Sequence, residues 1–302
     1  MQRNQANIAL GLIITAAFCI LSTPSRADWD RNNPADVAKA KWVQLPDLSI
    51  TGLDVLDTLQ PNAPTPPGPQ WKILADDFRC TQSGPITDVH IWGSWLNNIL
   101  PHDEAGNADP GAIRFKLSFH ADVPDPNPTD PADFSHPGIQ LWSAIFDPGK
   151  FQVNPNVITA NEQFYDPNLD AIIGTDNLVY QYNFTTLLDA AGKPFVQSVN
   201  NIYWLDVQAE VLNQPGQVPA VFGWKTRNPQ EHYNDDAVFA DTAGFAGGLI
   251  TDWQELRYPA GHPLFNRSMD LSFVLTVPEP SSIALLGVGL IGLVRAARRR
   301  RA

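Results

Sequence analysis

Apolar and polar residues alternate strictly along residues 113–123, and this pattern constrains the fold more than any other feature of the chain. The odd-numbered positions hold Ile, Phe, Leu, Phe, Ala and Val, whereas the even-numbered positions hold Arg, Lys, Ser, His and Asp. Because successive side chains of a strand point to opposite faces, a period of two residues predicts a half-buried antiparallel strand. No long helical pattern, with its period of about 3.6 residues, runs through the sequence.

Other apolar segments have the same character of strands, at residues 71–78, 86–95, 139–146, 178–184, 202–211, 221–226, 237–240 and 271–277. The 27 prolines fall between nearly all of these segments, where they favour turns and disfavour helices. Together the segments predict an all-β fold of two packed antiparallel sheets, a β-sandwich or jelly roll. We expect a single domain over residues 45–277, with a short helix near residues 51–59.

The N-terminus has the three parts of a secretory signal. Arg3 supplies a positive charge, residues 8–21 form an apolar run, and Ser25 and Ala27 are small residues at the positions that signal peptidase reads. These features predict that residues 1–27 form a signal-peptide helix that is removed after Ala27. A retained N-terminal membrane helix is the alternative. Residues 28–44 are then a polar arm in front of the domain.

The C-terminus combines a proline-rich triplet, a short apolar run and a cluster of arginines. The apolar run covers residues 283–294, and as a helix it is slightly short for a bilayer core of about 30 Å. A buried core helix is the alternative, but the glycines of this run weaken a soluble helix and the arginines favour a cytoplasmic membrane surface. The residues of the triplet and the cluster are Pro278, Glu279, Pro280, Arg298, Arg299, Arg300 and Arg301.

The order of these three parts resembles the PEP-CTERM sorting signal, which would occupy residues 278–302. The resemblance implies a substrate of an exosortase-type enzyme in a Gram-negative bacterium, held in the inner membrane before processing and then placed at the cell surface or in the extracellular matrix. Segments of the middle region, such as residues 86–95, 222–227 and 234–239, resemble an uncharacterised domain found in such proteins. That second resemblance implies a single domain and assigns no functional residue.

The middle region is strongly acidic. Removing the seven basic residues of the two ends and Glu279 leaves 13 basic and 31 acidic residues, a formal net charge of −18. Such a surface excludes nucleic acid as a partner and attracts cations. The pairs Asp76–Asp77 and Asp235–Asp236 and the acidic loop at residues 122–133 offer oxygen ligands of the kind that Ca²⁺ prefers. None has the spacing of a known calcium loop, so a calcium ion stays without an assigned site, and turn or cap roles are the alternative.

Three aromatic side chains fall among polar residues of predicted strands. Trp204 shares its face with Asp206, and His90 and Trp92 share theirs with Asp88. An exposed ring beside carboxylates and an imidazole can bind a sugar, because the ring packs against sugar C–H groups and the polar groups bind hydroxyls. His90, Trp92 and Trp204 are therefore candidates for binding carbohydrate, including exopolysaccharide. Burial beneath a long proline-rich loop is the alternative.

Catalytic motifs are missing from the sequence. Neither a His-Glu-x-x-His nor a Gly-x-Ser-x-Gly pattern occurs, and Cys80, the single cysteine beyond residue 27, is expected to be a small buried hydrophobe. We assign no catalytic residue and no cofactor. The sequence predicts an exported, non-catalytic surface or matrix protein with a structural or adhesive role. A carbohydrate-binding module, assisted by calcium, is the alternative.

Overall fold

The computed structural model describes residues 29–58, 71–130, 133–212, 218–246 and 250–277. The predicted signal peptide, the C-terminal sorting signal and both terminal helices lie outside these residues. Within them, none of the helices is long and apolar enough to cross a membrane. Strands dominate the described chain, which confirms the predicted all-β class.

One of the two main sheets has six strands, and all its pairings are antiparallel. Its order is β14 (Gln254–Glu255), β13 (Val238–Thr242), β3 (Trp71–Arg79), β11 (Ile202–Val211), β6 (Ile113–Val123) and β7 (His136–Phe146). The alternation along β6 is confirmed on the inner side, because Phe115, Leu117 and Phe119 are all fully buried.

The other main sheet has seven strands. Its order is β1 (Ala40–Gln44), β15 (Phe273–Thr276), β5 (Asp88–Trp95), β12 (Phe222–Lys225), β2 (Leu53–Leu56), β8 (Gln152–Asp166) and β9 (Ala171–Phe184). Its pairings are antiparallel except for the parallel pair β2–β8. Strand β9 also pairs with β5, so β5, β12, β2, β8 and β9 form a closed ring of paired strands.

Short elements complete the described chain. Strands β4 (Gly84–Pro85) and β10 (Val196–Gln197) form a small ladder of their own. The helical pieces are α1 (Pro34–Lys39), η2 (Leu96–Asn98) and η3 (Pro229–Glu231).

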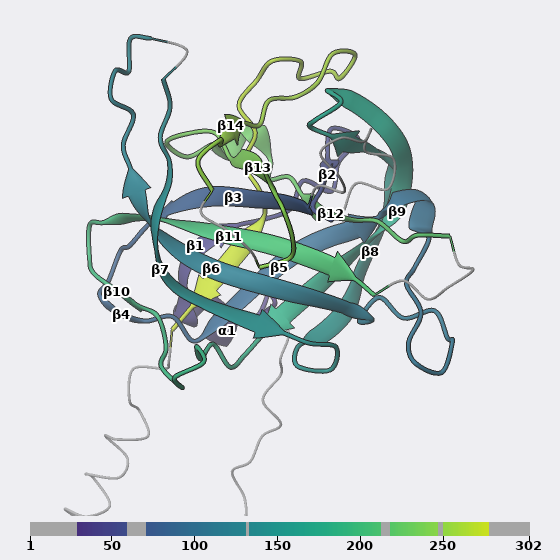
Figure 1. Ribbon diagram of the computed structural model, residues 1–302, viewed down its shortest axis with the longest axis horizontal. Helices are drawn as coiled ribbons and strands as arrows, with labels where there is room; N and C mark the ends of the chain where they lie inside the picture. The colour runs from purple at the N-terminus through teal and green to yellow at the C-terminus, as the bar shows by residue number, and fades with distance from the viewer. Residues whose placement is uncertain (1–28, 59–70, 131–132, 213–217, 247–249, 278–302) are drawn as a thin grey trace, which may run out of the picture.

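The two large sheets lie one over the other (Figure 1). The main core lies between them and is rich in aromatic rings. Phe115 on β6 contacts Phe222 on β12, with ring centroids 5.3 Å apart. Phe78 on β3 contacts Phe273 on β15 at 6.1 Å. Each buried phenylalanine stabilises the fold by about 1.5–3 kcal/mol through removal of apolar surface from water. These contacts across the interface make the two sheets a sandwich.

The outer face of the six-stranded sheet is also covered. Trp204, Ile73 and Val238 project from it into a second apolar cluster, which Trp253 closes from the chain beyond β13. The polar side chain of His120 is buried on the same face. Strand β6 is therefore buried on both sides over part of its length, whereas its alternation predicted a half-buried strand.

Two segments near the N-terminus differ from expectation. The short helix predicted at residues 51–59 is wrong, because strand β2 occupies this segment and pairs with both β12 and β8. The described part of the predicted polar arm is built into the domain. Its strand β1 pairs with β15, and Trp29 packs edge-on against Trp92 with ring centroids 6.4 Å apart.

Candidate functional site

The three residues predicted to bind sugar are all buried. The side chains of Trp204, Trp92 and His90 belong to residues that are 0%, 2% and 5% exposed. Trp204 donates its indole N–H to Asp122 Oδ1 at 2.8 Å, and Nδ1 of His90 lies 2.6 Å from Asn183 Oδ1. The structure therefore corrects the prediction of an exposed aromatic face, because the N-terminal segment and the chain around Trp253 cover these rings.

The acidic pairs singled out in the sequence have protein partners. Asp76 and Asp77, successive residues of β3, point to opposite faces of the strand and accept hydrogen bonds from the backbone N–H of Leu271 and from the side-chain amide of Asn234, respectively. Asp236 forms an ion pair with Arg257, with the charged atoms 2.7 Å apart.

Asp235 and the acidic loop also form hydrogen bonds with other protein groups. Asp235 accepts a hydrogen bond from the Ser135 hydroxyl. In the loop, Asp125 accepts the backbone N–H of Asn127, as in an Asx turn. The Asp125 contact matches the turn role that was the alternative to a calcium site, whereas the Asp235 contact joins two distant parts of the chain.

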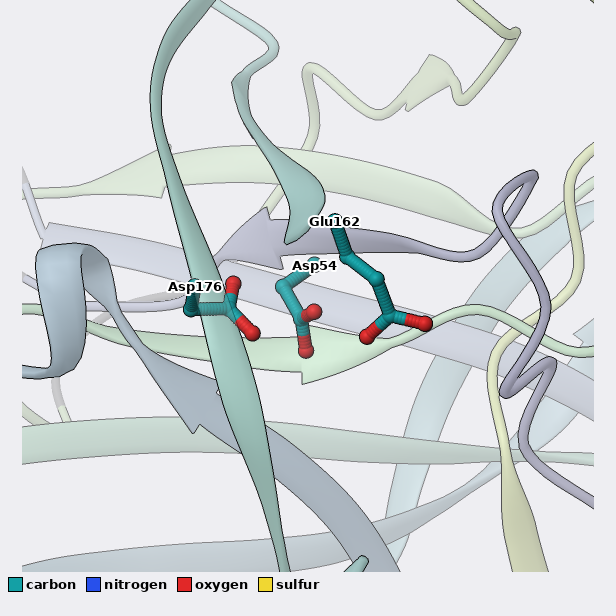
Figure 2. Close-up of side chains that lie close together, drawn as sticks. All are labelled: Asp54, Glu162 and Asp176. Atoms are coloured by element: carbon teal, nitrogen blue, oxygen red, sulfur yellow. The ribbon is translucent and has the colours of Figure 1, made fainter. Parts of the chain in front are cut away.

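A different group of carboxylates converges inside the closed ring of strands. Asp54 on β2, Glu162 on β8 and Asp176 on β9 each place one oxygen within 4.8 Å of the others. Figure 2 shows the three side chains directed toward one another, with Asp54 between the other two. The three residues are 0%, 0% and 1% exposed. Among the described residues, this is the group of metal-ligating side chains that comes within the span of a single ion.

Lys225 on β12 supplies the positive charge of this cluster. Its Nζ lies 3.0 Å from Asp54 Oδ2 and 2.6 Å from Glu162 Oε2, and the lysine side chain is fully buried. We call Asp54, Glu162, Asp176 and Lys225 the carboxylate–lysine cluster.

The register of the sheet assembles the carboxylate–lysine cluster. Lys225 lies directly opposite Asp54 in the β12–β2 pair, and Glu162 lies directly opposite Asp176 in the β8–β9 pair. Directly opposed residues of antiparallel strands share a face, so each pair meets side by side. The parallel pairing of β2 with β8 then brings the two pairs together.

The backbone at Gly52 lies in close contact with the cluster. A Cβ at Gly52 would overlap the carbonyl oxygen of Asp47 and would lie 2.8 Å from Glu162 Oε1 and 2.9 Å from Lys225 Nζ. A side chain at position 52 would therefore displace the backbone or the ion pair. The backbone passes this close to the charges only because glycine has no Cβ.

Burial and like charges raise the pKa of the carboxylates. Burial, followed by the charges of Asp54 and Glu162, raises the pKa of Asp176 to about 9. Burial raises the pKa of Glu162 to about 7, although the charge of Lys225 opposes this. Burial alone would lower the pKa of Lys225, but its carboxylate neighbours outweigh burial and raise it. The lysine therefore stays charged, and the three acids outnumber it.

Several oxygens of the cluster lack a well-formed hydrogen bond, namely Asp54 Oδ1, Glu162 Oε1 and both carboxylate oxygens of Asp176. The Ser94 hydroxyl lies close enough to Asp54 and Asp176 to lower the pKa of both carboxyl groups, although burial outweighs this effect. Buried polar atoms are normally satisfied, because an unpaired one costs about 1–3 kcal/mol. The arrangement can hold protons or a cation, since its free atoms are all oxygens and its three carboxyl groups outnumber its single ammonium group.

Sequence reasoning missed this cluster. Its four members are far apart along the chain, and three of them lie on strands that were predicted incompletely or not at all. One signal was present, because Asp54 and Lys225 each interrupt an apolar run that reads as a buried strand. A charge at such a position requires an internal partner.

Comparison with known proteins gives two matches. The family described as a domain of unknown function, DUF7901, matches residues 40–276. The PEP-CTERM protein-sorting motif matches residues 276–301. No curated protein and no solved structure matches the chain. Both resemblances drawn from the sequence are confirmed, and the carboxylate–lysine cluster lies within the matched domain.

Proposed function

This chain belongs to the DUF7901 family, whose function is unknown, and we propose that it is a non-catalytic cell-surface or extracellular-matrix protein with a structural or adhesive role. The observation that carries the proposal is the match of residues 276–301 to the PEP-CTERM sorting motif. That motif implies an exported protein that is transiently anchored in a membrane and processed by an exosortase.

The proposed route begins with export. Residues 1–27 act as a signal peptide, and the apolar run at residues 283–294 holds the exported chain in the inner membrane of a Gram-negative cell. The exosortase-type enzyme then acts at the triplet Pro278, Glu279 and Pro280. The net charge of −18 over residues 28–278 keeps the domain soluble and disfavours nucleic acid as a partner.

The position of the last strand supports a mechanical role. The sorting motif begins where β15 ends, and β15 pairs with β1 on one side and β5 on the other. A pull on the C-terminus therefore loads two antiparallel ladders along their length. The start of β1 lies opposite the end of β15, at Ala40 and Thr276, so chain entry and exit share one end of the sandwich (Figure 1). The other end is then free to face outward.

The sorting part of the proposal is tested by substitutions in the triplet. The variant carries Pro278→Ala, Glu279→Ala and Pro280→Ala, and the matched control carries Ser281→Ala and Ser282→Ala immediately downstream. Both are expressed in a host with an exosortase, and the cells are fractionated. We expect wild type and control at the surface, and the triplet variant in the inner membrane with its tail intact. Equal processing of the triplet variant contradicts the route.

The structural or adhesive role requires a separate experiment. Cells that lack the protein are compared with cells that carry it, for attachment to a surface and for cohesion of the extracellular matrix. We expect a loss of attachment or cohesion that returns with the wild-type chain. Unchanged attachment and cohesion, with the protein correctly at the surface, would refute the role and leave the sorting route intact.

A further inference from the structure

The carboxylate–lysine cluster is buried and has more acidic groups than basic ones. Three carboxylates face a single ammonium group, and all four residues are at most 1% exposed. If all four groups are ionised, the cluster carries a net charge of −2. Such a charge away from water is costly unless protons or a cation neutralise it.

Lys225 leaves part of each carboxylate unused. Lys225 binds Asp54 Oδ2 and Glu162 Oε2, whereas Asp54 Oδ1, Glu162 Oε1 and both Asp176 oxygens lack a cationic partner, and the Ser94 hydroxyl is the neutral group near Asp54 and Asp176. Two ligands of one Ca²⁺ ion, each at about 2.3–2.6 Å, are separated by no more than about 5 Å. The 4.8 Å span of the three carboxylates meets this condition.

We propose that Asp54, Glu162 and Asp176 bind one Ca²⁺ ion inside the closed ring of strands. The ion links β2, β8 and β9, and its two positive charges balance the net charge of the cluster. This inference goes beyond the proposed function, because neither sorting nor attachment requires a metal.

The chemistry of the ligands selects the ion. The cluster offers only oxygen atoms, which suit Ca²⁺, Mg²⁺ or Mn²⁺ and disfavour metals that prefer nitrogen or sulfur. Mg²⁺ keeps several waters of its own, and three residues that are at most 1% exposed leave little room for them. Ca²⁺ accepts bidentate carboxylates and irregular geometry, so Asp176 can supply both of its free oxygens. The Ser94 hydroxyl is a further oxygen at the same place.

Lys225 has a positioning role in this site. It fixes one oxygen each of Asp54 and Glu162 by ion pairing and leaves the other oxygen of each carboxylate for the ion. It also limits the affinity, because its positive charge repels the ion. We therefore expect a dissociation constant in the range of extracellular calcium modules, about 10⁻⁴–10⁻³ M.

The test is a calcium titration of the full-length chain, purified in a mild detergent and stripped of metal with a chelator. Thermal unfolding and titration calorimetry are measured with CaCl₂ alone, and with MgCl₂ for selectivity. At about 10 mM Ca²⁺ this affinity raises the melting temperature by roughly 3–10 °C, from linkage and the size of the domain. Calorimetry should report one ion per chain.

Three variants locate the ion. Asp176→Asn keeps the shape of the side chain and removes its charge, so we expect the calcium-induced shift to disappear. Because the raised pKa of Asp176 already keeps this buried carboxyl neutral in chelator, the neutral Asn should melt close to wild type there, which separates loss of binding from loss of fold. Asp125→Asn in the acidic loop and Asp252→Asn at an exposed position should keep the full shift.

Two results overturn the proposal. One is a wild-type melting temperature that does not respond to Ca²⁺ up to about 10 mM, which would mean that protons alone neutralise the cluster. The other is a shift that Asp176→Asn retains or that Asp125→Asn abolishes, which would place calcium outside the ring.

Discussion

Replacement of Trp204 by alanine tests whether this ring is a core residue or a binding surface. Trp204 is fully buried among Ile73, Val238 and Trp253, and its indole N–H donates to Asp122. Truncation of a buried tryptophan typically costs about 3–5 kcal/mol through lost apolar burial and the cavity left behind. The lost hydrogen bond adds about 1 kcal/mol, because Asp122 keeps some access to water. We therefore expect Trp204→Ala to lower the free energy of unfolding by about 4–6 kcal/mol.

This loss is a large part of the 5–15 kcal/mol by which a typical domain is stable. The assay is urea unfolding followed by far-ultraviolet circular dichroism, which does not depend on tryptophan fluorescence. Trp204→Phe should cost less, about 1–2 kcal/mol, because it keeps most of the apolar volume and loses the indole N–H. The control is Phe265→Ala, since that ring is 61% exposed and its removal should change stability by less than about 1 kcal/mol.

A small loss of stability in Trp204→Ala would contradict the burial of this ring. If Trp204→Ala costs no more than Phe265→Ala, the indole is not packed as described and a role in binding becomes open again. If the expected loss of stability is found, Trp204→Ala destabilises the fold. A loss of sugar binding in this variant would then not show that Trp204 contacts a sugar.

Three further predictions follow from the buried charges and the close backbone contact. Lys225→Met should lower the free energy of unfolding by about 3–5 kcal/mol at pH 8, because it leaves buried carboxylates without their cation. The loss should be smaller at pH 5, because the raised pKa values of Glu162 and Asp176 allow these groups to be protonated there. His120 lies 2.5 Å from Asp206, and despite burial and the nearby charge of Lys116 this contact raises the pKa of His120 and lowers that of Asp206. Wild type should therefore exceed His120→Gln in stability most clearly at about pH 5–6, and this difference should shrink as pH rises through the raised pKa of His120. Gly52→Ala should cost at least about 2 kcal/mol, because the new Cβ overlaps backbone.

Urea titrations at several pH values, which give the free energy of unfolding, test all three predictions. Lys193→Met, at an exposed lysine, should be nearly neutral at both pH values, and an equal effect of the two lysine variants would contradict the first prediction. A His120→Gln difference that does not vary with pH would contradict the second. Gly244→Ala meets no atom within 4 Å, so a similar cost for both glycine variants would contradict the third.

The strands that the sequence predicted share a clear apolar alternation or a continuous apolar run. Strands β3, β5, β6 and β11 are of this kind, and their existence follows from local pattern alone. Strand β8 was missed because its segment is mostly polar, contains a proline and has register shifts that interrupt the period of two. Strand β2 was mistaken for a helix because it has only four residues, and its conformation depends on pairing with β12 and β8.

The candidate site was harder to predict than the fold. Alternation along β11 correctly placed Trp204 on the face away from the main core. It could not reveal that the chain around Trp253 covers this face, because periodicity reports the side of a strand and not what packs on it. The carboxylate–lysine cluster depends on strand order and register across a closed ring, which local sequence does not encode.

The intact mass of the protein at the surface of a cell that expresses an exosortase decides whether the chain is exported and processed as described. We expect a chain that begins at Asp28 and lacks the arginine cluster Arg298, Arg299, Arg300 and Arg301. A surface form that retains these arginines would contradict processing of the sorting motif. A form that retains Met1 would contradict cleavage after Ala27.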